Sequence, residues 1–575
     1  MLSNSVAAAM LATCYVLLVV LHLNPRLPLA PPHLLPIVRS VGLFYVVHLI
    51  VVFYVLLVAR QLLARELMSP AWISVGVLSW LGALAAAVGS ALMWANLSTF
   101  SLVLSPETVA AMTQGALALA VSSALFLLVA FGHWNSDETQ RTLWAVCLVI
   151  VSFVSVATPL VFRGRAVELT LEARPLEAVL ETPPPERTAR VEVLAIDGAS
   201  LDFIARATAE GRLPNFGRIL DSGAATGLAT LHPTSPEAVW SAVATGKLPQ
   251  KNGVRSAAVY RTATGEDPIR LLPDFCYSSG LLRFGVLAEE PLTSGALRAR
   301  PVWNILTLLG IRVGIVNWPL TYPAPIVRGY VVSDRYIRPT GSLATVDDPA
   351  AVYPPELLAA MTPPGADLPA VLPAGTATPV PVRHQLPGRS DRAYEKVAGW
   401  LEATQPAQVT ITRYESIDPI GHYFLRYAEP QEFGNVPEED RRRYGQILES
   451  HYGFIDEAIG RALAALGPDD LLLVVSGYGM EPLGFAKRAL EQVLGDPELS
   501  GTHEGAPDGF LLAYGAAVAR IRQLRRASIV DVVPTMLYFL GLPIGRDMDG
   551  YARTDIFQPA FTEDHPITFI PTYER

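Results

Sequence analysis

The chain has 575 residues, of which 51% are hydrophobic and 17% charged, and its formal net charge at pH 7 is −9. This composition is too apolar for an ordinary soluble protein and indicates that membrane and globular parts share one chain. A net negative charge without a basic cluster excludes the nucleic-acid-binding class, because a polyanion would be repelled.

Five apolar runs in the first third of the chain are each close to the ~20 residues that a helix needs to cross a membrane. They are Val6–Leu23, Val41–Val58, Ile73–Leu97, Gly115–Phe131 and Leu143–Phe162. The first run has no basic segment before it and others follow it, so we interpret it as a retained helix rather than a signal peptide. Residues 1–165 are therefore predicted to form an all-α, multi-pass membrane region.

The arginines between these runs do not decide the orientation of the membrane region. With the N-terminus inside, Arg60, Arg65 and Arg141 would be cytoplasmic, and Arg26, Arg39, Arg163 and Arg165 would lie outside, which is nearly balanced. A polar connector at 166–188, stiffened by consecutive prolines, is predicted to be a linker.

After the linker, short apolar runs alternate with helical patterns. The strand-like runs are Val191–Gly198, Ile311–Trp318, Ala407–Tyr414 and Asp470–Gly477, and the helical patterns include Pro214–Ser222, Ser235–Thr245 and Tyr444–Leu466. Strands that are apolar throughout and alternate with helices predict an α/β fold with a mainly parallel sheet and helices on both faces. This domain is expected to span 189–575, with a cap or long loops in the proline-rich stretch 339–387.

Polar side chains stand at the carboxyl ends of the predicted strands, where such sheets bind their ligands. Asp197 follows the first strand, Asp418 and His422 follow the third, and His503 lies in a later segment between two glycines. Carboxylate and imidazole groups from separate segments suit zinc or a similar divalent ion. A lone aspartate is weak evidence, but glycines beside His503 indicate that the backbone must approach closely there.

The segment HPTSPEAVW places a hydroxyl side chain at a predicted helix start. Thr234 or Ser235 is the expected N-cap, Pro236 suits the first helical position, and Glu237 favours the positive end of the helix dipole. Most Ser-Pro pairs do no more than start a helix. A hydroxyl in this position is also well placed to attack phosphorus, because the free amide groups of a helix N-terminus stabilise an anion.

In combination, these segments closely resemble the type I phosphodiesterase/nucleotide pyrophosphatase branch of the alkaline phosphatase superfamily. The resemblance begins at LAIDGASLDFIARATAEGRLPNFGRILDSGAATGLATLHPTSPEAVWSAVATGKLPQKNGV and continues in order through NWPLTYPAPIVRGYVVSDR, ESIDPIGHYF, THEGAPDGFLLAYG and SIVDVVPTMLYFLGLPIGRDMDG. It covers about residues 189–575, and the predicted membrane helices lie outside it.

The resemblance implies a two-metal phosphoester site and a covalent intermediate on Ser or Thr. Asp418, His422 and His503 match the ligands of one metal, and Asp197 matches a ligand of the other. The remaining ligands of the second metal would be the Asp and His of a Ser-Asp-His-Gly motif. This chain has Gly-Tyr at those two places, and a phenol with a pKa near ~10 is a poor substitute. We therefore expect one divalent ion, zinc or similar, and a degenerate second site.

The resemblance also suggests the catalytic and substrate-binding residues. Ser235 fits the family spacing to the following tryptophan better than Thr234, and Asp197, if it binds no metal, is the nearest base. Asn252 stands where the family usually has His before Gly, and we expect it and Arg255 to bind substrate. Glu481, Glu504 or Arg255 are alternative groups for completing an unusual metal site.

The function expected from the sequence is a membrane-anchored, metal-dependent phosphoester hydrolase or phosphotransferase, with phosphodiesters the favoured substrates. The membrane helices suggest a lipid or lipid-linked cell-envelope substrate, and the family resemblance suggests an extracytoplasmic catalytic domain. The alternative is a non-catalytic protein of the same fold that acts as a membrane binding or assembly partner. A transporter is disfavoured because the apolar runs carry no acidic residue.

Overall fold

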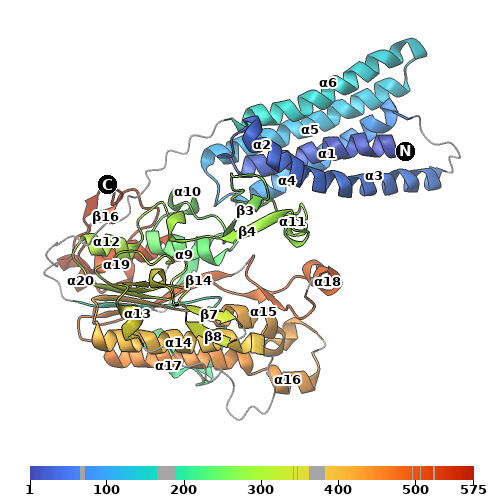
Figure 1. Ribbon diagram of the computed structural model, residues 1–575. Helices are drawn as coiled ribbons and strands as arrows, with labels where there is room; N and C mark the ends of the chain where they lie inside the picture. Colours follow the sequence, from blue (N-terminus) through green and yellow to red (C-terminus); the bar gives the residue numbers. More distant parts are fainter. Residues whose placement is uncertain are drawn as a thin grey trace. The chain divides into compact units, whose positions relative to one another are not determined.

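The computed structural model of the chain describes residues 1–64, 72–164, 189–340, 342–345, 347–361, 382–434, 436–494, 496–505, 507–521 and 525–575. The chain divides into two compact units. The first consists of Met1–Leu169 and Arg255–Pro291, and the second of Thr170–Val254 and Leu292–Arg575 (Figure 1). The predicted linker at 166–188 lies outside the described residues.

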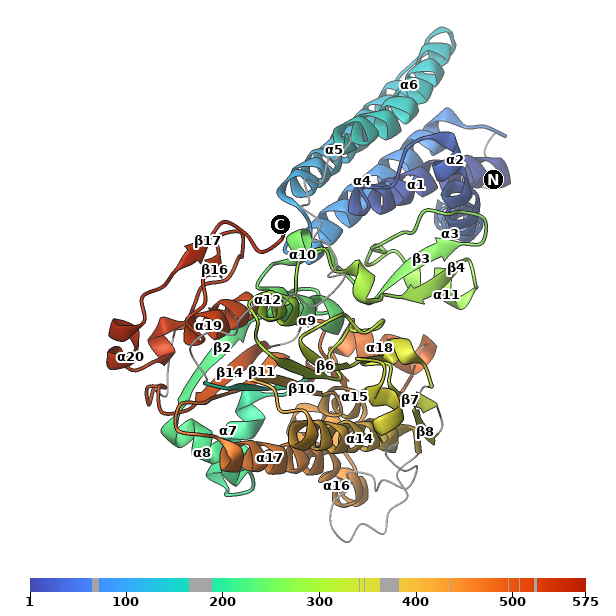
Figure 2. The ribbon, with the colours of Figure 1, turned by 60° about the vertical axis from the view of Figure 1, so that its left-hand side comes forward.

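The first unit is built mainly from long apolar helices (Figure 2). They are α1 (Leu2–Leu23), α2 (Pro31–Ile37), which continues through a π-helical turn at Val38–Gly42 into α3 (Leu43–Ala64), α4 (Val75–Phe100), α5 (Pro106–Trp134) and α6 (Glu138–Arg163). Serine side chains cap two of the helix starts: Ser74 accepts from Val77 N and Ser105 from Thr108 N. Five helical stretches among the described residues are long and apolar enough to cross a membrane, which indicates membrane association.

The segment 255–291 packs with these helices, although in sequence it follows the predicted nucleophile helix. It contains the hairpin of β3 (Ala258–Thr262) and β4 (Leu287–Pro291) and the short helix α11 (Ser278–Arg283). Buried side chains at the helix ends bond to its backbone: Asn96 accepts from Asp274 N at 2.7 Å, and the Tyr45 hydroxyl donates to Cys276 O at 2.8 Å. These bonds fix the segment to the apolar helices.

The second unit is organised around a nine-stranded sheet with the strand order β15-β2-β14-β11-β1-β10-β5-β6-β9. The strands are β1 (Val191–Ile196), β2 (Ala224–Ala229), β5 (Val313–Val316), β6 (Gly329–Val332), β9 (Val352–Tyr353), β10 (Val409–Tyr414), β11 (Leu471–Tyr478), β14 (Asp508–Tyr514) and β15 (Ala527–Ser528). The central strands from β11 to β6 are parallel, whereas β14 and β9 pair antiparallel with their neighbours. The predicted α/β class with a mainly parallel sheet is confirmed.

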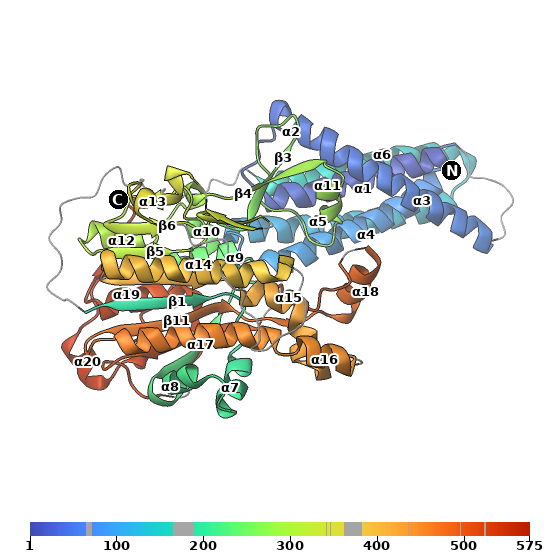
Figure 3. The same cartoon turned by 60° about the horizontal axis from the view of Figure 1, so that its bottom comes forward.

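Helices cover both faces of this sheet (Figure 3). The side chains that alternate along the strands are apolar on both sides, so each face must be covered. One face packs against α9 (Pro236–Thr245), α12 (Val302–Leu308) and α19 (Val532–Phe539). The other packs against α7 (Leu201–Ala209), α8 (Pro214–Ser222), α15 (Ile417–Ala428) and α17 (Ile447–Ala465), and α14 (Val382–Thr404) packs against residues of β5 and β6. The carboxyl ends of β1, β10 and β11 therefore meet at one edge.

Smaller elements surround this core. They are α10 (Pro249–Asn252), α16 (Glu438–Tyr444), α18 (Phe485–Leu494), α20 (Pro559–Asp564), β12 (Glu481–Pro482), β13 (Gly501–Thr502), β16 (Ile544–Gly545) and β17 (Phe569–Ile570). The stretch 339–387, predicted to be a cap or loops, includes parts of the β7 (Ile337–Thr340) and β8 (Ser342–Thr345) hairpin, then β9, α13 (Leu357–Ala360) and the start of α14. Its residues 362–381 lie outside the described part of the chain.

Candidate active site

Three predicted metal ligands converge at the carboxyl edge of the sheet. Asp418 lies in the first turn of α15, His422 lies one turn later, and His503 follows β13. Asp418 Oδ1 is 3.9 Å from His422 Nε2 and 3.8 Å from His503 Nε2. One ligand atom from each residue lies within 4.8 Å of the others, a spacing in which the three could hold one divalent cation.

The hydrogen bonds of the two histidines orient their free nitrogens toward the aspartate. His422 Nδ1 is 2.8 Å from Gly501 O, and His503 Nδ1 is 3.2 Å from Thr234 O. A carbonyl oxygen can only accept, so each Nδ1 carries the hydrogen and each Nε2 keeps its lone pair. Metal-binding histidines are commonly held in this way by a carbonyl behind the ring.

Asp418 provides an independent test of whether a cation fits. Its Oδ1 is buried and has no hydrogen-bond partner in the described part of the chain. Burial raises the pKa of Asp418, while the two facing histidines act to lower it. A buried carboxylate oxygen without a partner is costly, and a cation between it and the two Nε2 atoms would remove that cost. The donor set therefore fits a divalent ion.

Glycines allow the segments of this cluster to approach one another. A Cβ on Gly501 would lie 2.6 Å from Gly421 O, and a Cβ on Gly421 would lie 2.3 Å from Met480 Sδ. Gly198, at φ +66°, has a Cβ position 3.0 Å from Asp418 Cα. Side chains at these places would push β13, the end of β1 and α15 apart, so the ligand geometry depends on the glycines.

Asp197, which the family resemblance assigns to the second metal, has other partners in this structure. Arg413 Nε donates to Asp197 Oδ1 at 2.9 Å, and Arg413 Nη2 donates to Oδ2. Trp240 Nε1 also donates to Oδ1, at 2.7 Å. Burial alone would lower the pKa of Arg413, but Asp197 raises it well above its ordinary value. A buried guanidinium thus provides positive charge beside this carboxylate.

The two altered motif positions also fail to provide metal ligands. A Cβ on Gly477 would lie 2.4 Å from Val239 Cγ1, so an aspartate there would collide with α9. Tyr478 is fully buried, and its hydroxyl has no hydrogen-bond partner among the residues that the structure describes. Burial raises the pKa of Tyr478 well above its ordinary value, which keeps the phenol neutral. The residues of this corner do not fit a second metal ion.

The two hydroxyl candidates for the nucleophile differ in their surroundings. Thr234 is buried, and its Oγ1 donates to Leu231 O at 2.8 Å. Ser235, the partly exposed N-cap of α9, donates from Oγ to Glu237 Oε2 at 3.0 Å. Since the Thr234 carbonyl also contacts His503, this corner lies against the metal-ligand cluster. Ser235 is the hydroxyl with both access and a neighbouring carboxylate.

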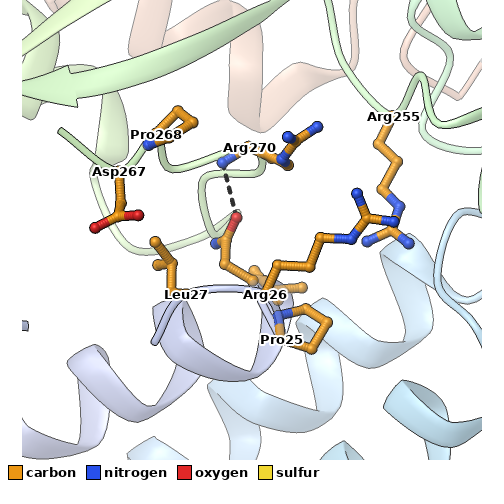
Figure 4. Close-up of a pocket in the computed structure, with 9 residues that line it drawn as sticks. Pro25, Arg26, Leu27, Arg255, Asp267, Pro268 and Arg270 are labelled. Atoms are coloured by element: carbon orange, nitrogen blue, oxygen red, sulfur yellow. Dashed lines mark hydrogen bonds between the residues drawn. The ribbon is translucent and has the colours of Figure 1, made fainter. Parts of the chain in front are cut away.

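The two residues predicted to bind substrate, Asn252 and Arg255, belong to different units of the chain. Asn252 is buried at the end of α10, where its Nδ2 donates to Lys247 O at 2.8 Å and its Oδ1 accepts from Val254 N at 2.9 Å. Those two bonds stabilise the turn between Lys247 and Val254. Arg255 belongs to the first unit and lines a pocket there (Figure 4). Of the alternatives, Glu504 forms an ion pair with Lys487.

Arg413 is a site residue that was not predicted from the sequence, and for Glu237 only a helix-dipole role was predicted. A signal for Arg413 was present, because it is the one charged residue of the predicted strand VTITRY, and a charge inside a buried strand requires a buried counter-charge. No comparable signal marks Glu237, since an acidic residue in the first turn of a helix is common.

A comparison with known protein families shows which family the chain belongs to. The model of the type I phosphodiesterase / nucleotide pyrophosphatase family matches residues 191–535, which is more than half of the chain. The chain belongs to this family. The resemblance seen in the sequence is thereby confirmed. Membership supports phosphoric ester hydrolase activity, and the family is metal-dependent.

Solved structures and curated proteins add little to this assignment. Two structures of murine ectonucleotide pyrophosphatase/phosphodiesterase 5, one of them an inactive variant in complex with AMP, match with 12% identity and a TM-score of 0.38. Each match covers 64% of this chain and 100% of the solved chain. No curated protein matches the sequence.

Proposed function

We propose that the protein is a phosphodiesterase or phosphotransferase that uses one divalent cation of the zinc class and Ser235 as nucleophile. Asp418, His422 and His503 would hold the cation. The observation that carries this proposal is the bond from His503 Nδ1 to Thr234 O, which holds the start of α9 against the ligand cluster. A nucleophile and a metal site are then adjacent, as phosphoryl transfer requires.

The neighbours of Ser235 suggest how its hydroxyl is activated. When bound, a divalent cation would polarise the phosphoryl oxygens. Ser235 Oγ would form a bond to phosphorus while the ester P–O bond breaks, its proton moving to Glu237 and the leaving alkoxide taking a proton from solvent. The amide groups at the start of α9 would stabilise the added negative charge. Water or another alcohol would then take the phosphoryl group from Ser235.

In this proposal Glu237 replaces Asp197 as the base. Both oxygens of Asp197 accept hydrogen bonds from Arg413, and Oδ1 also accepts one from Trp240, so this carboxylate is already engaged by fixed donors. Glu237 already accepts the Ser235 hydroxyl hydrogen. Arg413 would serve as a fixed positive charge on the side where the family resemblance implies a second ion, so the site would need one cation only.

The five apolar helices suggest a substrate in or at the membrane, such as a phospholipid or a lipid-linked envelope precursor. The family relationship suggests an extracytoplasmic location of the second unit. Anchoring by a single helix would suffice for a soluble substrate. The number of helices therefore supports a lipid-linked phosphoester as the substrate class.

Metal content and hydrolysis of an aryl phosphodiester and an aryl phosphomonoester, measured on the full chain in detergent, test the proposal. We expect one ion per chain and faster cleavage of the diester. Ser235→Ala should lower kcat by about 10³-fold or more, Glu237→Gln by about 10²–10⁴-fold, and the matched control Thr234→Ala by less than about tenfold. Two ions per chain, or none, would contradict the one-metal site. Equal inertness of wild type and all variants would favour the non-catalytic binding partner.

A further inference from the structure

Three aromatic side chains of the segment 255–291 are exposed, although this segment packs with the apolar helices. Phe275 is 67% exposed, Tyr277 49% and Phe284 62%. These three residues, the aromatic rim, lie next to the short helix α11, and none of them belongs to the candidate active site. Large aromatic side chains that are exposed together on one short segment indicate a surface that meets an apolar partner.

Hydrogen bonds anchor the turn that carries the rim. Cys276, between two of the rim residues, is buried, and its carbonyl accepts from the Tyr45 hydroxyl at 2.8 Å. Phe275 and Tyr277, on either side of it, have φ values of +59° and +53°, a left-handed conformation that aromatic residues rarely adopt. The buried cysteine and its two exposed neighbours therefore belong to an anchored turn and not to a loose loop.

The aromatic rim is continuous with the start of α3. The centre of the Phe44 ring lies 6.3 Å from that of Tyr277 and 6.0 Å from that of Phe284. The exposed His48 ring, one turn further along α3, lies 6.4 Å and 6.0 Å from the same two rings. The rim and the first two turns of α3 thus form one surface.

The exposed side of α3 indicates what covers this surface. Apolar residues that are more than half exposed recur there every four positions, at Leu43, Val47, Val51 and Val55. Residues with this spacing form a stripe along one side of a helix. The helix has the length and hydropathy of a membrane span, so we interpret the stripe as facing lipid acyl chains.

The depth of the rim in the membrane follows from the charges on this helix. Residues 40–59, between Arg39 and Arg60, include no Asp, Glu, Lys or Arg and match the ~20 residues that cross the hydrocarbon layer. Phe44 and His48, which contact the rim, lie near the Arg39 end of this stretch. The rim is therefore expected at the boundary between headgroups and acyl chains, where aromatic side chains are favoured.

We propose that the aromatic rim inserts into this boundary layer and that phospholipid is its partner. On the same segment, β4 carries the exposed Glu289 and Glu290, which suit water, so only the part around α11 is suited to lipid. The segment lies within the residues that match the family, 191–535. Part of the phosphodiesterase sequence would then touch the bilayer directly. This inference does not depend on the proposed catalytic function.

Photo-crosslinking of the full chain in nanodiscs of phosphatidylcholine and phosphatidylglycerol tests the proposal. Phe275 and Phe284 are replaced, one at a time, by the photoreactive p-benzoylphenylalanine, and lipid adducts are measured by mass spectrometry. We expect yields within about threefold of that at Val47, on the stripe, and at least about fivefold above that at Glu289. Yields no higher than at Glu289 would overturn the proposal. So would a crosslink to a second copy of the chain in place of lipid.

Radical footprinting of the unmodified chain keeps the test valid if the replaced side chains disturb the fold. Hydroxyl radicals oxidise side chains in water faster than side chains covered by lipid. In nanodiscs we expect Tyr277 to be oxidised at least about fivefold more slowly than Tyr551 of the second unit, a larger difference than their exposed fractions of 49% and 79% explain. Oxidation rates in proportion to these fractions would show that the rim lies in water and would overturn the proposal.

Discussion

The two halves of the candidate active site use the same strand ends in opposite ways. On one side, Asp418, His422 and His503 direct ligand atoms toward one another, and a buried carboxylate oxygen has no hydrogen-bond partner among the described residues. On the other side, both oxygens of Asp197 are bonded by Arg413, and Trp240 adds a third bond. The first side is spaced so that it could hold a cation from solution, whereas the second has a positive charge built into its strand.

This difference changes the interpretation of the degenerate motif. Gly477 and Tyr478 look in the sequence like lost ligands. In the structure a guanidinium already neutralises the remaining carboxylate, and the space for an aspartate at 477 is taken by Val239. Replacement of the second metal ion by the Arg413 guanidinium explains the two altered motif positions better than random loss of ligands does. Five measurements test whether the two sides of the site differ in this way.

Removing a ligand from the metal side should have the largest effect. We expect His503→Ala to lose its metal and to hydrolyse an aryl phosphodiester about 10³-fold more slowly or worse, because two ligands do not retain the ion. His565→Ala, a histidine of the same unit that stacks on Phe561, is the matched control. Unchanged metal content in His503→Ala would refute the ligand assignment.

Removing the built-in charge should destabilise the fold without removing the metal. Arg413→Gln leaves the Asp197 carboxylate buried without its counter-charge, and we expect the free energy of unfolding to fall by about 3–5 kcal/mol. Denaturant unfolding of the full chain measures this, with the exposed Arg312→Gln as control. A loss of less than about 1 kcal/mol would show that the pair contributes little.

Restoring the family motif should fail to restore a second metal. Gly477→Asp introduces a side chain against Val239, and we expect it to cost about 1–3 kcal/mol of stability while the ion content stays at one per chain. Gly484→Asp is the control, since a Cβ there meets nothing within 4 Å. A second ion bound by Gly477→Asp would show that Arg413 does not block that position.

Acidification should release the ion from the metal side. A metal ligand must be deprotonated, and burial raises the pKa of Asp418, so protons compete for it at a higher pH than for a surface aspartate. We expect metal affinity to be constant at alkaline pH and to fall by about tenfold or more per pH unit once a ligand protonates, equivalent to about 1.4 kcal/mol per unit. Equilibrium dialysis between about pH 8 and about pH 5 measures this. Affinity independent of pH would contradict the Asp-His-His ligand set.

The smallest effect concerns the unbonded phenol. Tyr478→Phe removes a buried hydroxyl without a hydrogen-bond partner among the described residues, and we expect stability to be unchanged or to rise by up to about 1 kcal/mol. The control is Tyr452→Phe, whose hydroxyl accepts from Ser200 N at 2.9 Å and whose loss should cost about 1 kcal/mol. Destabilisation of Tyr478→Phe would indicate that the hydroxyl has a role in the site.

The helices and strands that local periodicity encodes could be predicted from the amino-acid pattern alone. The apolar runs became helices of membrane-spanning length, the four strand-like runs became β1, β5, β10 and β11, and the spacing of Asp418, His422 and His503 anticipated a cluster that the structure also brings together. These features depend on the alternation of side chains over a few residues or on a shared family pattern.

The pairing of groups that are distant in the chain could not be predicted and follows from the fold. Sheet register places Arg413 beside Ala195 on the neighbouring strand, two residues before Asp197, and no local pattern connects positions 216 residues apart. The side chain of Asn24 binds the backbone at 270–271 and so joins the segment 255–291 to the apolar helices. Pairings of this kind depend on strand register and on the satisfaction of buried polar groups, which exist only when the chain is folded.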